Sequence, residues 1–521
     1  MNRSTKRERN CLIRSHQGWV EQDMYEVWAS VKKAIGALTG EAGQMAQAIA
    51  AIGITGQGDG TWLIGRSGEP VRRALTWLDA RACEIVKQWQ EEGIAHEIFL
   101  ITGSVPTSSS QSAQLSWLSA HEPEVLRDGV AALYAKDWVF YKMTGEVSSD
   151  ESDAGHTFFD IQKFEPSHKV MELTGIPQFS HLIPRVRFSY QNIGQLKDDV
   201  ASELGLRKGI AVVAGPFDIP ATALGLALYR DGEVYSIIGT AAIHGMVMDT
   251  FLLNPIDVGY TIRFGPDGKW LRVMPTASGT LSLEWFFKVI GLGGDRNHIN
   301  QRQGPHDKWC FAQDSEIRLP YSFEDDFLYR DIEIRLNAIP PGSEGVIYLP
   351  FIEHLGERAP FVNPDVRGEF FGVSITTSRY NLLRAIYEGI ALAMKDCYLQ
   401  MPREFTEAKV AGGGARSPFW MQLMADVTGK ILKTAKGIEF GARGAAINAG
   451  VATGLFKSFE TAMKSMEISW EEFRPTEESF QRYGRIFSLY KELCHALKPL
   501  WAKRLNLLAG DSGGNCGNSE G

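Results

Sequence analysis

The stretch that decides the fold is Ile210–Tyr229, which reads IAVVAGPFDIPATALGLALY. Its first five residues are apolar and predict a buried strand, which Gly215 and Pro216 end. A helix is expected from about Pro220, because proline favours a first helical turn and an Ala/Leu run follows it. Asp218 therefore lies where a strand passes into a helix, and open α/β sheets bind their ligands at such positions. The alternative role for Asp218 is that of a helix cap, since aspartate is a favoured N-cap.

Length and composition are those of a globular protein with more than one domain. Two large domains are expected from 521 residues, because a single hydrophobic core rarely serves so long a chain. The net charge of −8 gives no electrostatic argument for nucleic acid or an acidic membrane as a partner. No apolar run is long enough to span a bilayer, and no apolar segment follows the basic start, so a cytoplasmic protein is expected.

A second passage from strand to loop comes earlier in the chain. Residues Ala48–Thr55 predict a buried strand, which ends in the glycine-rich loop Gly56–Gly60, GQGDG. This loop carries Gln57 and Asp59 as polar side chains at a strand end. A plain polar turn would contain the same residue types.

The remainder of the first half predicts further strands and helices. Residues 10–16 are expected to form a short strand, and Asp23 is expected to cap the helix behind it. The cluster WLDAR, residues 77–81, is expected to open a helix that runs to about residue 91. At residues 133–141 a strand passes into a helix, with Lys136 and Asp137 at the junction, and a Ser/Asp-rich loop follows at 148–155.

The second half predicts two loops suited to phosphate or nucleotide. Val234–Ile238 and Ala241–Met248 are expected as hairpin strands around a Gly-Thr turn, whose N–H groups and hydroxyl can bind an anion. A glycine run at 412–414 lies between a strand at 409–411 and a helix at 419–428, a geometry that binds nucleotides or phosphates. A strand at 369–375 leads into another helix. The composition of residues 508–521 predicts a disordered tail.

Several motifs together resemble the FGGY family of carbohydrate kinases. Residues 368–388, GEFFGVSITTSRYNLLRAIYE, are similar to the second signature of the family, and Lys136-Asp137-Trp138 is similar to the first. Residues 17–23 resemble its PGWVEQD segment, and residues 412–417 resemble its adenosine motif. Within the family, GQGDGTW, WLDAR and GERAPFV (residues 356–362) look most like the erythritol kinase branch, with L-xylulose kinases second.

The resemblance implies two actin-like, ribonuclease H-like α/β domains, at 1–230 and 231–507, with a ligand cleft between them. It implies that ATP, with Mg²⁺, phosphorylates a small sugar or polyol, either erythritol or a ketopentose such as xylulose. The resemblance also implies that the protein forms a homodimer. By resemblance, Asp218 is the catalytic base and a magnesium ligand. The implied sugar-binding residues are Gln57, Asp59, Asp79 and Arg81, and the implied nucleotide-binding residues are Gly239, Thr240, Gly412, Gly413, Gly414 and Ala415.

One motif of the family has no counterpart in this sequence. The first strand of the family bears an Asp-x-Gly-Thr turn, the first phosphate loop, and neither Asp-x-Gly-Thr nor Asp-x-Gly-Ser occurs here. The first two strands are therefore expected to be missing, and the chain is expected to be a weak and poorly soluble kinase. The alternative is a non-catalytic relative that binds a sugar and has lost phosphoryl transfer.

Overall fold

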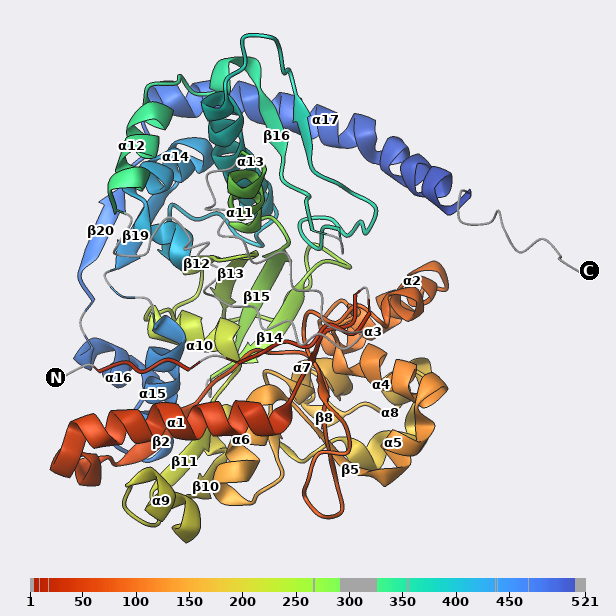
Figure 1. Ribbon diagram of the computed structural model, residues 1–521, viewed down its shortest axis with the longest axis vertical. Helices are drawn as coiled ribbons and strands as arrows, with labels where there is room; N and C mark the ends of the chain where they lie inside the picture. Colours follow the sequence, from red (N-terminus) through yellow and green to blue (C-terminus); the bar gives the residue numbers. More distant parts are fainter. Residues whose placement is uncertain are drawn as a thin grey trace, which may run out of the picture.

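The strands before residue 230 and the strands after it form separate sheets (Figure 1). The computed structural model describes residues 4–290 and 326–510, except positions 9, 17, 266, 267, 354, 355, 436, 438 and 467. In Figure 1 the first half of the chain, red to yellow, fills the lower part, and most of the second half, green to blue, fills the upper part.

The second half is built on a seven-stranded mixed sheet, in the order β14-β15-β13-β12-β18-β19-β20. The central pairs β12–β18 and β18–β19 are parallel, and the other pairs are antiparallel. The strands are β12 (Val234–Ile238), β13 (Ala242–Met248), β14 (Tyr260–Phe264), β15 (Lys269–Thr276), β18 (Glu407–Ala411), β19 (Ile431–Ala435) and β20 (Trp470–Phe473). The helices include α11 (Leu281–Val289), α12 (Asp326–Asn337), α13 (Arg379–Leu399), α14 (Pro418–Thr428) and α17 (Glu477–Gly510). The largest apolar core joins this sheet to α13 and α14 through residues such as Ile238, Ile386 and Trp420.

The first half is built on a three-stranded sheet, β10-β11-β2, in which β11 and β2 are parallel. The strands are β2 (Ala51–Ile54), β10 (Ile193–Gln195) and β11 (Ala211–Ala214), with a separate pair β3 (Trp62–Gly65) and β5 (Gly129–Leu133) and shorter pairs elsewhere. The helices are α1 (Met24–Ala42), α2 (Cys83–Glu91), α3 (Ile94–Thr102), α4 (Gln111–His121), α5 (Pro123–Asp128), α6 (Ala135–Thr144), α7 (Ala154–Phe158), α8 (His168–Leu173), α9 (Asp198–Leu204) and α10 (Asp218–Gly225). Among the described strands, β2 pairs only with β11 and so lies at the edge of its sheet.

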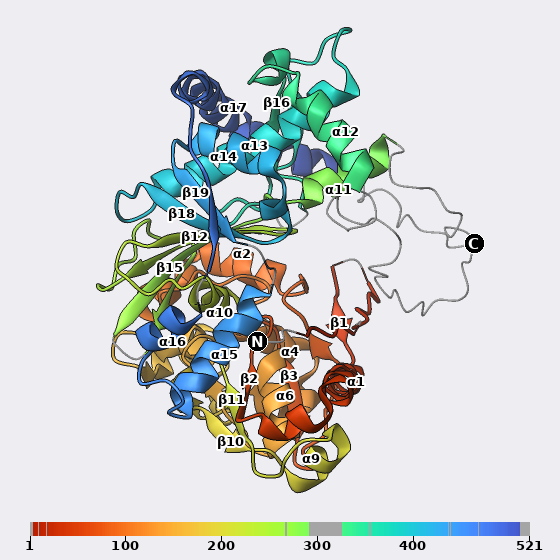
Figure 2. The ribbon, with the colours of Figure 1, turned by 90° about the vertical axis from the view of Figure 1, so that its left-hand side faces the viewer.

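One helix of the second half packs on the first half. Helix α15 (Phe440–Ala452) lies against α10 and β2 (Figures 1 and 2). Glycines allow this approach: a Cβ at Gly53 would lie 2.3 Å from the Ala445 carbonyl oxygen, and one at Gly444 would lie 1.8 Å from the Ala221 carbonyl oxygen. The small residues of this segment are therefore explained by a close crossing of helices and strand.

Most expected elements are confirmed, including the Asp23 cap, whose carboxylate accepts from Tyr25 N–H and Glu26 N–H. Several expectations were wrong at their boundaries. Strand β2 begins at Ala51 rather than Ala48, because residues Gly43–Ala48 form a 3-10 helix. Helix α2 begins at Cys83 rather than residue 77, because residues 76–82 form turns. Strand β17 (Glu369–Phe371) ends early because Gly372 has a φ of 84°. The segment at 10–16 forms only a single bridge, from Ile13 to Glu21.

The chain end is helical further than expected. Helix α17 runs to Gly510, three residues into the segment for which a disordered tail was expected. The remainder of that segment, 511–521, lies outside the described residues. Within the described residues, no helix is both long and apolar enough to cross a membrane.

Candidate active site

Two strand ends of the first half bring Asp218 beside the glycine-rich loop at 56–60. Strands β2 and β11 run parallel with Ile54 opposite Ala214, so the segments that follow them leave the sheet together. The N–H of Gly215 donates to the Ile54 carbonyl (2.8 Å), and the N–H of Asp218 donates to the Gly56 carbonyl (2.8 Å). Polar residues that lie about 160 positions apart in the chain are therefore neighbours in the fold.

Asp218 is the first residue of α10, and Phe217 occupies the N-cap position. The capping alternative for Asp218 is therefore wrong. The residue is exposed, yet surrounding protein atoms displace much of the bulk water, and this desolvation raises the pKa of its carboxyl to about 7. The neighbouring Asp59 carboxylate raises the pKa of Asp218 further. Because water still reaches the carboxyl group, solvation offsets part of this rise in its pKa.

The loop after β2 holds two polar side chains near Asp218. Asp59 has a φ of 55°, which aspartate tolerates better than most residues, and its Oδ2 accepts from Ser109 Oγ (3.1 Å). The Nε2 atom of Gln57 is buried and has no hydrogen-bond partner among the described residues. Such a donor costs free energy unless something pairs with it, so Gln57 is available to a ligand.

A hollow of about 280 Å³ lies between the two halves next to this loop. The first half lines it with α2 and residues 105–109, and the second half contributes Tyr260, Arg358 and Asp365. Ser109 connects the hollow to the loop, since it lines the hollow and donates to Asp59. The site thus has a partly open hollow of small-molecule size bounded by both halves.

Asp79 and Arg81 form a buried ion pair before α2. Both Asp79 oxygens are engaged: Oδ1 accepts from Arg81 Nε (2.8 Å) and Oδ2 accepts from Arg81 Nη2 (2.9 Å) and from Val20 N–H (2.7 Å). The Arg81 guanidinium stacks on Trp19, 4.2 Å from the ring centre. Its Nη1 atom is buried and has no hydrogen-bond partner in the described part of the chain. The structure therefore brings this pair to the start of α2, whose residues line the hollow.

The two glycine loops of the second half also meet. In the parallel pair β12–β18, Ile237 lies opposite Ala411, so the turn at Gly239-Thr240 and the run at 412–415 follow adjacent strands. Gly412 has a φ of 95°, and a Cβ there would lie 2.4 Å from the Ile238 carbonyl oxygen, which excludes any side chain. Thr240 is exposed at the turn. Backbone without side chains at adjacent strand ends allows close approach of a phosphate or nucleotide.

Asp218 also lies close to a strand of the second half. Burial, and after it the charge of Asp218, raises the pKa of Tyr235, a residue of β12. Asp218 therefore faces the strand that ends in the Gly239-Thr240 turn.

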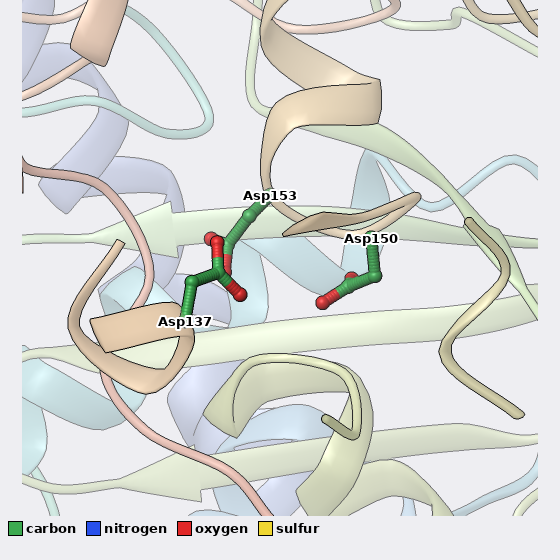
Figure 3. Close-up of side chains that lie close together, drawn as sticks. All are labelled: Asp137, Asp150 and Asp153. Atoms are coloured by element: carbon green, nitrogen blue, oxygen red, sulfur yellow. The ribbon is translucent and has the colours of Figure 1, made fainter. Parts of the chain in front are cut away.

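A buried charged cluster beneath Asp218 was not predicted. Carboxylate oxygens of Asp137, Asp150 and Asp153 lie within 4.8 Å of one another (Figure 3). The Lys136 ammonium pairs with Asp137 (2.7 Å), with Asp153 (3.0 Å) and with Asp150, and all four side chains are fully buried. The sequence analysis treated the Lys-Asp junction and the Ser/Asp-rich loop as separate segments, and the three acids within 150–153 were the available signal.

Comparison with family models identifies both halves of the chain. The N-terminal domain of the FGGY family of carbohydrate kinases matches residues 3–225, and the C-terminal domain of that family matches residues 324–453.

Curated relatives agree with these matches along almost the whole chain. An erythritol kinase of Brucella abortus (strain 2308) is 30% identical over 505 residues, covering 95% of this chain and 92% of the relative. An L-xylulose/3-keto-L-gulonate kinase of Escherichia coli (strain K12) is 28% identical over 499 residues, covering 95% of this chain and 92% of the relative.

Solved structures share the fold. The ligand-bound xylulose kinase of Lactobacillus acidophilus superposes with a TM-score of 0.81 at 21% identity, covering 95% of this chain and 93% of that chain. A xylulose kinase of Rhodospirillum rubrum gives a TM-score of 0.77 at 22% identity, covering 95% of this chain and 93% of that chain. At these identities the likeness shows the fold alone, and it confirms the expected two-domain actin-like, ribonuclease H-like architecture.

Proposed function

Because this chain belongs to the FGGY family of carbohydrate kinases, we propose that it transfers a phosphoryl group from ATP to a hydroxyl of a small sugar or polyol. The proposed acceptor is erythritol or a ketopentose such as L-xylulose, after the names of the relatives. One observation carries the proposal: Asp218, after a strand end of the first half, lies close enough to β12 of the second half to raise the pKa of Tyr235, and glycine loops follow β12 and β18.

Asp218 is the proposed catalytic base. Its pKa, raised to about 7 by desolvation, lets the carboxylate accept a proton from a hydroxyl near neutral pH. Its place in the first turn of α10, with its own N–H bonded to Gly56, fixes the main chain from which the side chain projects. Phosphoryl transfer asks of a protein mainly such positioning and charge stabilisation.

Gln57 and Asp59 are the proposed sugar ligands. The unpartnered Gln57 Nε2 donates to one sugar oxygen, and the Asp59 carboxylate, already held by Ser109, accepts from a hydroxyl. Analogues without those hydroxyls leave buried polar groups unpaired and are rejected. For Arg81 we propose that the free Nη1 reaches the sugar, with Asp79 holding the guanidinium in place.

The residues of the second half fit a nucleotide. The side chains that Gly412 and Gly414 lack would collide with Ile238, so the backbone there is open to the adenosine and phosphates. The proposed ligands are Gly239, Thr240 and the run at 412–415. ATP supplies the phosphoryl group, and Mg²⁺ neutralises its charge. The Asp218 carboxylate, close to a second carboxylate at Asp59, is a hard oxygen ligand suited to that ion.

The test measures turnover and binding on the same samples. Release of ADP from ATP and Mg²⁺ is assayed with erythritol, L-xylulose, D-xylulose and glycerol, and binding of each is measured by calorimetry. We expect product with erythritol or a ketopentose. Asp218→Asn should lower kcat by at least about a hundredfold and leave sugar affinity nearly unchanged.

A matched control and two outcomes decide between the functions. Asp198→Asn makes the same change at the first residue of α9, where the aspartate is exposed and paired with Lys208, and should retain full turnover. Sugar binding without ADP release would favour the non-catalytic relative. Full turnover of Asp218→Asn would refute its role as base.

A further inference from the structure

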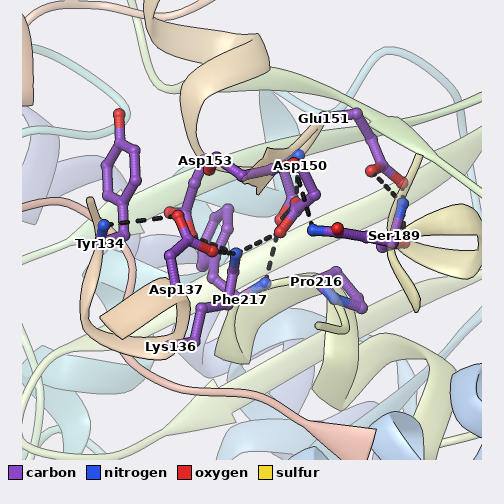
Figure 4. A network of polar contacts seen from close by, with 12 residues as sticks. Tyr134, Lys136, Asp137, Asp150, Glu151, Asp153, Ser189, Pro216 and Phe217 are labelled. Carbon is purple, nitrogen blue, oxygen red and sulfur yellow. Dashed lines mark hydrogen bonds and ion pairs between the residues drawn. The ribbon is translucent and has the colours of Figure 1, made fainter. Parts of the chain in front are cut away.

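The buried cluster is joined through Ser152 to the turn that precedes Asp218. Figure 4 shows Lys136, Asp150 and Phe217 of this network. Asp150 Oδ1 accepts from the N–H of Ser152 (2.7 Å) and from its hydroxyl (2.5 Å). The Ser152 Oγ in turn accepts from the N–H of Phe217 (3.0 Å), the residue directly before Asp218. A polar path therefore leads from the Lys136 ammonium to the turn that carries the proposed base.

We propose that Lys136, Asp150 and Ser152 are positioning residues that fix the turn at 215–218 and so set the direction of the Asp218 carboxylate. The inference rests on the proposed function, because it concerns how the base of that reaction is held.

The turn has anchors on two sides. On one side, the N–H groups of Gly215 and Asp218 donate to carbonyls of the β2 segment. On the other, Ser152 holds the Phe217 N–H, and no side chain caps α10. Without the Ser152 hydroxyl, that buried N–H loses its partner. The turn is then held by the bonds of Gly215 and Asp218 and by the Thr55 hydroxyl, which donates to the Pro216 carbonyl (2.8 Å), and it can rotate about that one side. A carboxylate displaced by about 1 Å is enough to lower a transfer rate strongly.

The buried cluster orients the hydroxyl group of Ser152. Because the Ser152 proton is committed to Asp150, a lone pair of the oxygen is left for Phe217. Lys136 compensates the charge of Asp150, which otherwise would be buried without a cation. Burial raises the pKa of Asp137 and of Asp153, so the site favours a lower charge than three ionised carboxylates.

The same contacts argue against a metal centre in this cluster. Three carboxylates this close together could bind a cation, but the ammonium of Lys136 already contacts all three. The ammonium therefore lies where a metal cation would lie, and both oxygens of Asp153 have this ion pair but no hydrogen-bond partner among the described residues. The role of the cluster is assigned to the hydrogen bonds that leave it.

The test is Ser152→Ala, with Ser116→Ala as the matched control. Ser116 also donates through its hydroxyl, to the carbonyls of Ser112 (2.8 Å) and Thr174 (2.6 Å), but it lies in α4, away from the turn. Both variants lose hydrogen bonds of one serine, so loss of stability alone affects both. Only Ser152→Ala should lower kcat about tenfold or more, with the KM for the polyol within about twofold of wild type.

A second measurement does not depend on turnover. The carboxyl ¹³C signal of Asp218, identified by its loss in Asp218→Asn, is titrated in labelled protein. The titratable groups near Asp218 are Asp59 and Tyr235, and neither is changed. In Ser152→Ala the freed turn exposes the carboxylate to more water, so the apparent pKa of Asp218 should fall by about one, while Ser116→Ala leaves it unchanged.

The outcomes separate this inference from the proposed function. If the wild-type chain forms no product, the proposed function is refuted. The ¹³C titration would still show whether Ser152 controls the pKa of Asp218. An unchanged pKa of Asp218 in folded Ser152→Ala would overturn the inference. If that variant does not fold, Asp150→Asn weakens the same hydrogen bond, and the same fall in kcat and in the pKa is required of it.

Discussion

Replacing Asp218 with asparagine should stabilise the folded protein while it removes activity. An acid whose pKa is raised in the folded state costs stability wherever its charged form is present, which is above its ordinary pKa. A rise from 3.8 to about 7 corresponds to an upper limit of about 4 kcal/mol at pH 8. Because Asp218 is exposed, water screens much of this cost, and about 1 kcal/mol is the expected gain for Asp218→Asn.

The pH dependence of that gain identifies its origin. The charged form is fully penalised above the folded pKa of about 7, and the penalty shrinks as the pH falls from there toward the ordinary value. The melting temperature of Asp218→Asn should therefore exceed that of the wild type by about 2 °C at pH 8, and by less at pH 5. Thermal unfolding followed by circular dichroism at both pH values measures this, with Asp198→Asn as the control.

One result would refute the reasoning. If Asp218→Asn melts at or below the wild-type temperature at pH 8, the carboxylate is not held at a cost in stability. The upward shift of its pKa would then have no support, and with it the argument that the fold prepares this residue as a base.

Three further predictions concern the rest of the site. Asp59→Asn should weaken polyol binding by about 1–3 kcal/mol in calorimetry and lower the apparent pKa of Asp218, because a neighbouring charge is removed; unchanged affinity would contradict the role of Asp59. Arg81→Lys should lower the free energy of unfolding by about 2–3 kcal/mol, since lysine can neither bond both oxygens of Asp79 nor stack on Trp19, and a urea midpoint equal to wild type would count against this. Gly412→Ala should raise the KM for ATP and leave the KM for the polyol unchanged, because its Cβ would meet the Ile238 carbonyl; equal effects on both would indicate general misfolding.

Local sequence pattern predicted the strand ends that build the site. The apolar runs before residues 56 and 215 and the glycines after them are short-range signals, and both strands form, although β2 begins at Ala51 rather than Ala48. The second-half hairpin and the glycine run at 412–414 were found in the same way. These features depend on residues within one turn or strand, which a single sequence contains.

Such local patterns do not predict contacts between segments that are far apart in the chain. Lys136 and Asp153 appeared as a helix start and a polar loop, and only the fold buries them together. The start of α2 was placed too early because the polar residues 77–81 resemble a helix opening, whereas Asp79 binds Arg81 and holds the segment in turns. In both cases charged side chains form a buried ion pair that the local sequence pattern does not predict.

The crossing of α15 over the first half affects how the protein is made. Ribosomes synthesise the chain from the N-terminus, so the surface of α10 and β2 that α15 covers is finished more than 200 residues before α15 itself appears. Until then, the backbone around Gly53 and Ala221 has no partner helix. The first half therefore reaches its final packing only after residue 452 has left the ribosome, and a fragment that ends near residue 230 exposes this surface to chaperones and proteases.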